Sequence, residues 1–127
     1  MWSGGCECGK VRFEAMEARP TITVCHCSQC RRTSGHLWAS TYVAKAALTF
    51  LNDEGLTWYA SSDFAQRGFC RFCGSSLFYR MNDEDGMGVA AGCLDDAEGL
   101  IIAKHIFAAD KGGYYEIPGG APVFEQG

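Results

Sequence analysis

Three thiols fall within six residues in the stretch Cys25-His26-Cys27-Ser28-Gln29-Cys30, and we expect the rest of the chain to be organised around it. Two cysteine pairs lie on either side, Cys6-Glu7-Cys8 and Cys70-Arg71-Phe72-Cys73, and one further thiol, Cys93, stands apart. Buried cysteines that only fill a core need no particular spacing, whereas metal sites take their ligands from short turns. The spacing therefore predicts metal binding.

The composition limits what the chain can be. It has 127 residues, of which 47% are hydrophobic and 20% charged, and these values are typical of a single globular domain spanning 1–127. No apolar run approaches the roughly 20 residues that a membrane-spanning helix needs. The first residues contain no basic stretch followed by an apolar one, so we expect no secretory signal and predict a cytoplasmic location.

Location and charge together narrow the function. Thiols stay reduced in the cytosol, where C-x-C and C-x-x-C pairs bind metals more often than they form disulfides, although disulfides are the alternative interpretation. The formal net charge is −4, and the 11 basic residues form no long stripe, so a nucleic-acid partner is not expected. A small-molecule partner is favoured.

Most of the first half shows strand patterns. Polar and apolar residues alternate over 10–15, a β-branched run over 21–24 leads to the central thiols, and residues 38–43 are again rich in strand formers. The polar residues 31–35 indicate a loop closed by a glycine, and residues 44–48 indicate a single helical turn. The central thiols are therefore expected at the end of a strand.

The second half indicates two hairpins and a last strand. Residues 48–51 and 56–59 flank a turn-forming run that ends in glycine, and residues 76–80 and 87–91 flank another. Residues 100–107 fit a further strand. No segment of ten or more residues has helical periodicity, so the sequence predicts one small all-β domain with many turns.

Four of the thiols match a structural zinc site. Cys6, Cys8, Cys70 and Cys73 supply the tetrahedral count, and a glycine follows the second cysteine of each pair, which lets the backbone turn so that its N–H groups point at the thiolates. Four buried hydrophobic cysteines are the alternative. A zinc staple of this kind would tie the first strand to the middle of the chain.

The central cluster supplies only three thiols, Cys25, Cys27 and Cys30. A zinc ion held by three protein ligands keeps an open position, which is typical of a reactive site. Three thiolates leave the centre with a net negative charge and make it a weak Lewis acid. A coordinated thiol is deprotonated and remains a soft nucleophile, so the favoured chemistry is thiolate attack on an electrophilic carbon, or its reversal.

The alternative for this cluster is a closed structural site with a fourth protein ligand. His26, His105 and Cys93 are the candidates. His26 is the weakest, because in an extended backbone it points away from the face that its two cysteine neighbours share. Cys93 lies in an apolar run that we interpret as a strand, where a cysteine is more often a small core residue.

Arg31 and Arg32 follow the cluster directly. A guanidinium group holds a carboxylate in two-point contact, so both are candidate substrate-binding residues. Alternatively, they are ordinary solvated residues or offset the thiolate charge. Trp38 and Tyr42 are candidates to line the pocket, although strand aromatics more often belong to the core. No residue stands out as a general acid or base, so catalytic residues beyond the zinc ligands stay unassigned.

The order of these motifs resembles the glutathione-dependent formaldehyde-activating enzyme family. The resemblance rests on Gly5-Cys6-x-Cys8-Gly9, Cys25-His26-Cys27-x-x-Cys30-Arg31-Arg32 and Phe69-Cys70-x-x-Cys73-Gly74, and continues through 92–96 and His105-Ile106. It implies antiparallel sheets in the β-tent fold, two zinc sites, and carbon–sulfur lyase chemistry on the adduct of glutathione and formaldehyde. By this resemblance the two outer pairs match the structural zinc ligands, and the central three thiols match the catalytic ones.

Two functions follow from these observations. The leading hypothesis is a zinc-dependent carbon–sulfur lyase that forms or cleaves S-hydroxymethylglutathione or a related thiol–aldehyde adduct. The competing hypothesis is a non-catalytic, zinc-stabilised binding module with its second zinc site structural or only partly occupied, because the family includes non-enzymatic relatives such as centromere protein V. Glutathione binding with proton release separates the two, since an open site takes up a thiol and a closed site does not.

Overall fold

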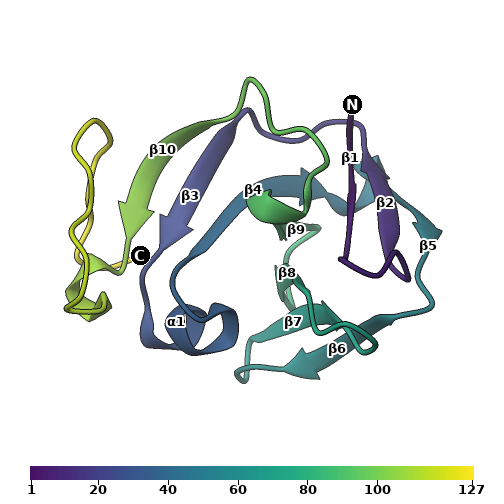
Figure 1. The fold of residues 1–127 in the computed structure, drawn as a ribbon, viewed down its shortest axis with the longest axis horizontal. Helices are drawn as coiled ribbons and strands as arrows, with labels where there is room; N and C mark the ends of the chain where they lie inside the picture. The colour runs from purple at the N-terminus through teal and green to yellow at the C-terminus, as the bar shows by residue number, and fades with distance from the viewer.

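The computed structural model describes residues 1–127 and is built mainly from β-strands (Figure 1). The strands are β1 (Trp2–Gly5), β2 (Arg12–Ala15), β3 (Thr21–Cys25), β4 (Trp38–Ala44), β5 (Leu48–Asn52), β6 (Leu56–Ala60), β7 (Ala65–Cys70), β8 (Ser76–Met81), β9 (Gly86–Ala90) and β10 (Ile101–Ile106). The helical segments are α1 (Ser28–Ser34) and the 3-10 turns η1 (Lys45–Ala47), η2 (Ala91–Cys93) and η3 (Ala108–Asp110). The predicted all-β fold class is confirmed.

The strands form two sheets. The smaller has the order β1-β2-β5 and the larger β10-β3-β4-β9-β8-β7-β6. In Figure 1 the larger sheet runs from β10 and β3 on the left through β4 to β7 and β6 at the lower right, while the smaller sheet lies on the right beside the N-terminus. Strands that are distant in sequence are therefore neighbours in the larger sheet, such as β10 and β3, or β4 and β9.

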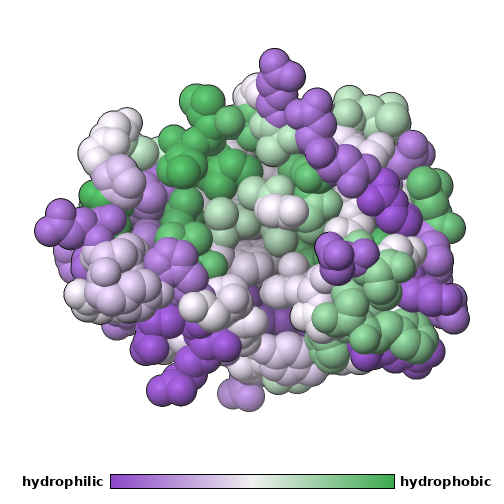
Figure 2. Space-filling model, in the orientation of Figure 1, coloured by the Kyte–Doolittle hydropathy of each residue, from purple (hydrophilic) through white to green (hydrophobic).

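One strand pair departs from the expected antiparallel sheets. β10 lies parallel to β3, with His105 opposite Val24 and Ile106 opposite Cys25, whereas the other neighbouring pairs are antiparallel. A parallel pair needs a long connection, and here six strands separate β3 from β10. β10 forms an edge of the sheet, and Figure 2 shows hydrophobic side chains gathered over β10 and β3, where Ile101 and Ile102 are exposed.

The main core joins the two sheets. Phe78 of β8 is fully buried, and its ring centroid lies 5.4 Å from that of Phe13 in β2 and 5.7 Å from that of Phe50 in β5. Trp58 of β6 stacks on the same ring at 5.9 Å. Aromatic groups from both sheets therefore converge on Phe78, and their burial contributes to the stability of the fold.

The predicted loop over residues 31–35 is wrong, because residues 28–34 form α1. Cys27 caps the helix, and its Sγ accepts a hydrogen bond from the backbone N–H of Cys30 at 3.2 Å. Gly35 ends the helix with φ at +89°, and its N–H bonds to the carbonyl of Arg31. Seven residues make only two turns, so too few positions exist for a helical repeat of apolar residues to show.

The two predicted hairpins have opposite outcomes. β8 and β9 pair as expected, with Tyr79 opposite Gly88. β5 and β6 do not pair with each other, because β5 pairs with β2 and β6 with β7, so the run between them carries the chain from one sheet to the other. The single helical turn is present as η1. Cys93 lies in η2 and not in a strand, so its predicted strand placement is wrong.

Candidate metal centres and the cavity beside them

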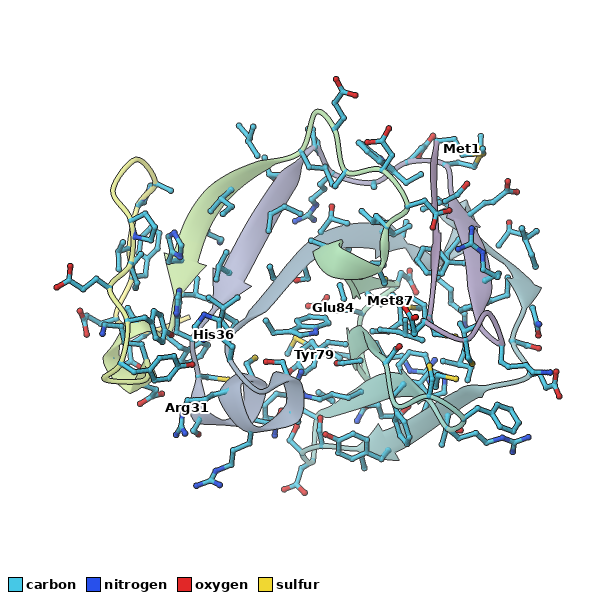
Figure 3. All side chains as sticks on the ribbon, in the orientation of Figure 1. Met1, Arg31, His36, Tyr79, Glu84 and Met87 are labelled. Carbon is cyan, nitrogen blue, oxygen red and sulfur yellow. The ribbon has the colours of Figure 1, made fainter.

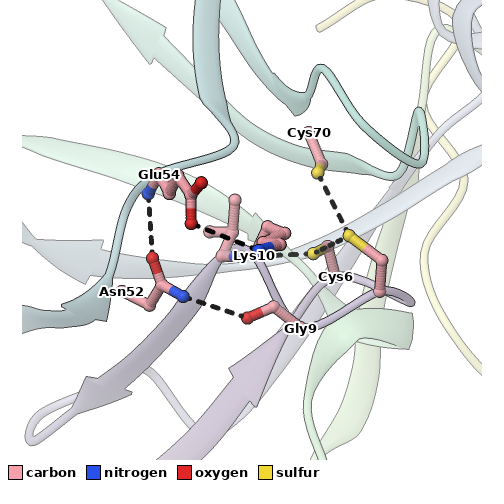
Figure 4. A network of polar contacts seen from close by, with 8 residues as sticks. Cys6, Gly9, Lys10, Asn52, Glu54 and Cys70 are labelled. Carbon is pink, nitrogen blue, oxygen red and sulfur yellow. Dashed lines mark hydrogen bonds and ion pairs between the residues drawn. The ribbon is translucent and has the colours of Figure 1, made fainter.

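The four outer thiols come together as predicted. The sulfur atoms of Cys6, Cys8, Cys70 and Cys73 all lie within 4.8 Å of one another. The Sγ of Cys8 is 3.7 Å from that of Cys6 and 3.7 Å from that of Cys70 (Figure 4). Four thiols at this mutual distance are the donor set of a tetrahedral metal site.

Backbone geometry shapes both turns of this cluster. Gly9 and Gly74 have φ values of +84° and +80°, a region that L-residues with side chains seldom adopt. Each turn closes on its first cysteine, with the N–H of Gly74 donating to the carbonyl of Cys70 at 2.7 Å. The N–H of Val11 donates to Cys6 Sγ at 3.2 Å, a bond that stabilises a thiolate.

A polar network fixes the first turn against the loop after β5 (Figure 4). Asn52 donates through Nδ2 to the carbonyl of Gly9 at 3.4 Å and accepts from the N–H of Glu54 at 2.9 Å. Lys10 and Glu54 form an exposed ion pair at 3.4 Å between the same turn and the same loop. Such a surface pair adds little to the free energy of folding. The loop that joins the two sheets is thereby tied to the thiol cluster.

The three central thiols form a second cluster. Cys25 ends β3, Cys27 caps α1 and Cys30 lies in the first turn of α1, and their sulfur atoms lie within 4.8 Å of one another. The N–H of Cys30 donates to Cys27 Sγ at 3.2 Å. The strand end and the helix start thus bring together three thiols that could hold one metal ion.

None of the candidate fourth ligands joins this cluster. His26 is buried on the other side of the strand end, where its Nε2 lies 2.9 Å from Nδ1 of His105 and its Nδ1 lies 2.6 Å from the hydroxyl of Tyr115. Burial, followed by the nearby His105, lowers the pKa of His26. Cys93 donates to the carbonyl of Ala90 at 3.0 Å, and burial raises the pKa of its thiol to about 12. The cluster therefore offers three protein ligands, so a tetrahedral metal ion bound there would keep one position free.

A cavity of about 620 Å³ opens beside the three thiols. Its walls include the three cysteines together with Thr23, Gln29, Trp38, Ser40, Ser62, Phe64, Arg67, Tyr79, Met81, Ile106, Phe107 and Asp110. Trp38 lines the cavity as predicted, whereas Tyr42 lies outside it and donates from its hydroxyl to Glu84 at 3.0 Å. A separate groove of about 660 Å³ contains Cys93 and the Arg12–Asp95 ion pair but none of the three thiols.

Arg67 of β7 lines the cavity and was not among the predicted site residues. Its side chain is almost fully buried, with 4% of the residue exposed. Nε donates to Gln29 Oε1 at 3.0 Å, Nη2 lies 3.4 Å from Cys30 Sγ, and the guanidinium sits 4.9 Å from the ring centroid of Tyr79. Hydrogen bonds from the Cys25 thiol and, to a lesser extent, from Arg67 lower the pKa of Cys30 to about 6 despite its burial.

Arg31 and Arg32 lie on α1 and do not line the cavity. Arg32 is exposed and Arg31 is half-buried. In the view of Figure 3, Arg31 projects from α1 on the side away from Tyr79. Their role in substrate binding stays a prediction, and a ligand that engages them must reach from the cavity around the helix.

Fold and geometry define a small β-protein with two cysteine clusters able to hold metal ions, one of four thiols and one of three beside a cavity. A sequence model of the family described as glutathione-dependent formaldehyde-activating enzyme matches residues 1–110, and the chain belongs to this family.

The chain is also similar to one curated protein and to one solved structure. An uncharacterised lyase of Schizosaccharomyces pombe is 26% identical over 97% of this chain and 90% of its own length. A crystal structure of a Rhodobacter sphaeroides protein has the same fold, with a TM-score of 0.60 and 24% identity over 95% of this chain and 98% of its own. No helix here is long and apolar enough to cross a membrane.

Proposed function

We propose that the protein is a zinc-dependent carbon–sulfur lyase that forms and splits the adduct of glutathione, or a related small thiol, with an aldehyde such as formaldehyde. The main support is a cluster of only three thiols that opens onto a cavity of about 620 Å³. Family membership and a relative described as a lyase support the reaction class. We further propose that residues 1–127 act as one domain, in the cytoplasm, where the thiols stay reduced.

The donor sets fit zinc at both clusters. Thiolates are preferred zinc ligands, and backbone N–H groups already point at Cys6 and Cys27. We assign the structural ion to the four-thiol cluster and the catalytic ion to Cys25, Cys27 and Cys30. When bound there, zinc would keep a substrate thiol in its nucleophilic thiolate form at neutral pH.

The protein's own residues then prepare the cavity for this reaction. Its walls include the aromatic residues Trp38, Phe64 and Tyr79, and a substrate seated against them would be partly shielded from water, which strengthens its polar interactions. Arg67 places a fixed positive charge against Cys30 and so offsets the accumulated thiolate charge. The remaining apolar space accommodates the carbon skeleton of a small peptide thiol and its aldehyde.

Glutathione binding tests this proposal directly. Zinc-loaded protein should bind glutathione with release of a proton, because the thiol enters the site as a thiolate. Calorimetry in two buffers with different ionisation enthalpies measures the proton, and S-methylglutathione, whose sulfur is blocked, is the matched control. Acceleration of the exchange between free formaldehyde and its glutathione adduct, followed by NMR, measures turnover.

The non-catalytic binding module predicts a different set of results. Equal binding of glutathione and S-methylglutathione, without proton release, would show that sulfur does not enter the site. Proton release without accelerated exchange would leave a thiol-binding protein that does not turn over. Either outcome would displace the lyase proposal.

Alanine substitution of Arg31 or Arg32 should weaken glutathione binding while zinc content stays unchanged. A peptide with two carboxylates is fixed by its sulfur at only one end, and the loss of one charge-assisted hydrogen bond costs about 1.5–3 kcal/mol, so affinity should fall at least about tenfold. Added salt should mimic part of the loss. Looser zinc binding as the first effect would instead show that these arginines only offset thiolate charge, and unchanged affinity in both variants would remove them from the substrate site.

A further inference from the structure

Three buried side-chain polar atoms without a hydrogen-bond partner belong to residues that line the cavity beside the three thiols. Four buried side-chain polar atoms lack a hydrogen bond: Arg31 Nε, Trp38 Nε1, Ser62 Oγ and Arg67 Nη1. Three of them, those of Trp38, Ser62 and Arg67, belong to residues of this cavity wall. Buried polar groups are nearly always satisfied, so such a concentration at one cavity indicates that a ligand completes them.

Two of these three residues, Trp38 and Arg67, contact Cys30. Trp38 packs against Cys30 in a small cluster separate from the main core. The guanidinium of Arg67 lies 5.6 Å from the ring centroid of Trp38, and its position is fixed by the contacts of Nε with Gln29 and of Nη2 with Cys30 Sγ. The third nitrogen of the guanidinium group, Nη1, takes part in neither contact and has no hydrogen-bond partner. The same side chain thus touches a thiol ligand and holds a free donor close to it.

The chemistry of the donors specifies the ligand atom. Indole and guanidinium groups only donate hydrogen bonds, so the missing partner must be an acceptor, and the fixed positive charge of Arg67 favours an oxygen that carries negative charge. Closeness to Cys30 favours an oxygen within a bond or two of the reacting sulfur over the distant carboxylates of a peptide thiol. The aldehyde oxygen meets both conditions.

We propose that Arg67 Nη1 and Trp38 Nε1 form an oxyanion-binding pair for the aldehyde oxygen, an inference that rests on the proposed lyase function. As the thiolate sulfur donates an electron pair to the carbonyl carbon, a C–S bond forms and the π pair of the C=O bond moves to oxygen. The alkoxide, held by the two donors, then takes up the proton that the thiol released. In the reverse direction this proton leaves, the C–S bond breaks and the carbonyl forms again. Donors aimed at developing charge are among the largest contributors to such reactions.

Binding of two small thiols tests the pair without turnover. Thioacetate carries an oxygen on the carbon attached to sulfur and shares its negative charge between sulfur and oxygen, whereas ethanethiol has the same S–C–C skeleton and no oxygen. The ratio of their affinities for zinc-loaded protein, measured by calorimetry, should fall at least about tenfold in Arg67→Met, the loss expected for a charge-assisted hydrogen bond. Trp38→Phe, which keeps an aromatic ring and removes the N–H, should lower the ratio about threefold or more.

The design separates a specific contact from a structural effect. Loss of the Arg67–Cys30 contact should change the affinity of the metal site for both thiols by the same factor. That factor cancels in the ratio of the two affinities. Arg80→Met is the matched control, because Arg80 also bonds a glutamine, Gln66, and lies over an aromatic ring, that of Trp58, but outside this cavity. Its ratio should equal that of the parent. Arg67→Lys should recover part of the ratio, since it restores the charge with a single donor.

Each outcome decides between the two proposals. An unchanged ratio in both Arg67→Met and Trp38→Phe would overturn the oxyanion pair, even if the parent accelerates formaldehyde exchange. A ratio that falls in both variants, together with a parent that does not accelerate exchange, would keep the pair and overturn the lyase function. If Arg67→Met does not fold, an unchanged ratio in Trp38→Phe overturns the pair and a lowered ratio supports it.

Discussion

Cys70→Ser will leave the protein largely unfolded at room temperature. Cys70 is fully buried at the end of β7, and its Sγ lies 3.7 Å from that of Cys8, 62 residues away in sequence. Ligands so far apart convert metal-binding energy into folding energy, about 10–16 kcal/mol for structural zinc in small peptides. This is comparable with the total stability of an ordinary domain, about 5–15 kcal/mol, so the loss of one ligand should remove most of that stability.

Thermal melting, circular dichroism and zinc content per chain measure this effect. Cys93→Ser is the matched control, because Cys93 belongs to neither cluster and a serine hydroxyl can still donate to the carbonyl of Ala90. That variant should fold with its zinc unchanged. If Cys70→Ser instead melts like the parent and retains its zinc, the structural assignment of the four-thiol cluster is wrong.

The thiol clusters were predictable because their spacing is local. A C-x-C or C-x-x-C turn fixes two sulfurs near each other through a few backbone angles, and the glycines at 9 and 74 mark the turns themselves. The grouping of Cys6 and Cys8 with Cys70 and Cys73 needed only the ligand count of zinc. The strands of the β8–β9 hairpin were likewise encoded by a short turn between two apolar runs.

The features that the sequence did not reveal depend on contacts between distant residues. Arg67 approaches Cys30 across 37 positions, and nothing within β7 says which neighbour its side chain meets. The partners of β5 and β6 were mispredicted because a turn signal does not show whether the flanking strands pair with each other or with strands elsewhere. The helix α1 owes its start to a cysteine cap, which is not among the usual capping residues.

The separation between the two thiol clusters extends to the cores that surround them. Cys6 and Cys70 belong to the main core of eleven buried residues, which also contains Phe78. Cys30 belongs to a cluster of three buried residues against which Cys25 and Cys27 pack. Loss of metal at the first site should therefore disturb the whole fold, whereas loss at the second should stay local.

Cys27→Ser should accordingly lose one zinc ion per chain, glutathione binding and lyase activity, yet stay folded with a melting temperature close to that of the parent. Serine is a preferred helix cap, so it can still accept the hydrogen bond from the N–H of Cys30 and keep α1 in place, which confines the change to the metal site. Cys27→Ala removes the cap as well and should cost about 1 kcal/mol more. Zinc content and thermal melting of both variants check this expectation. Global unfolding of Cys27→Ser would show that the central cluster is structural, and would favour the non-catalytic binding module over the lyase.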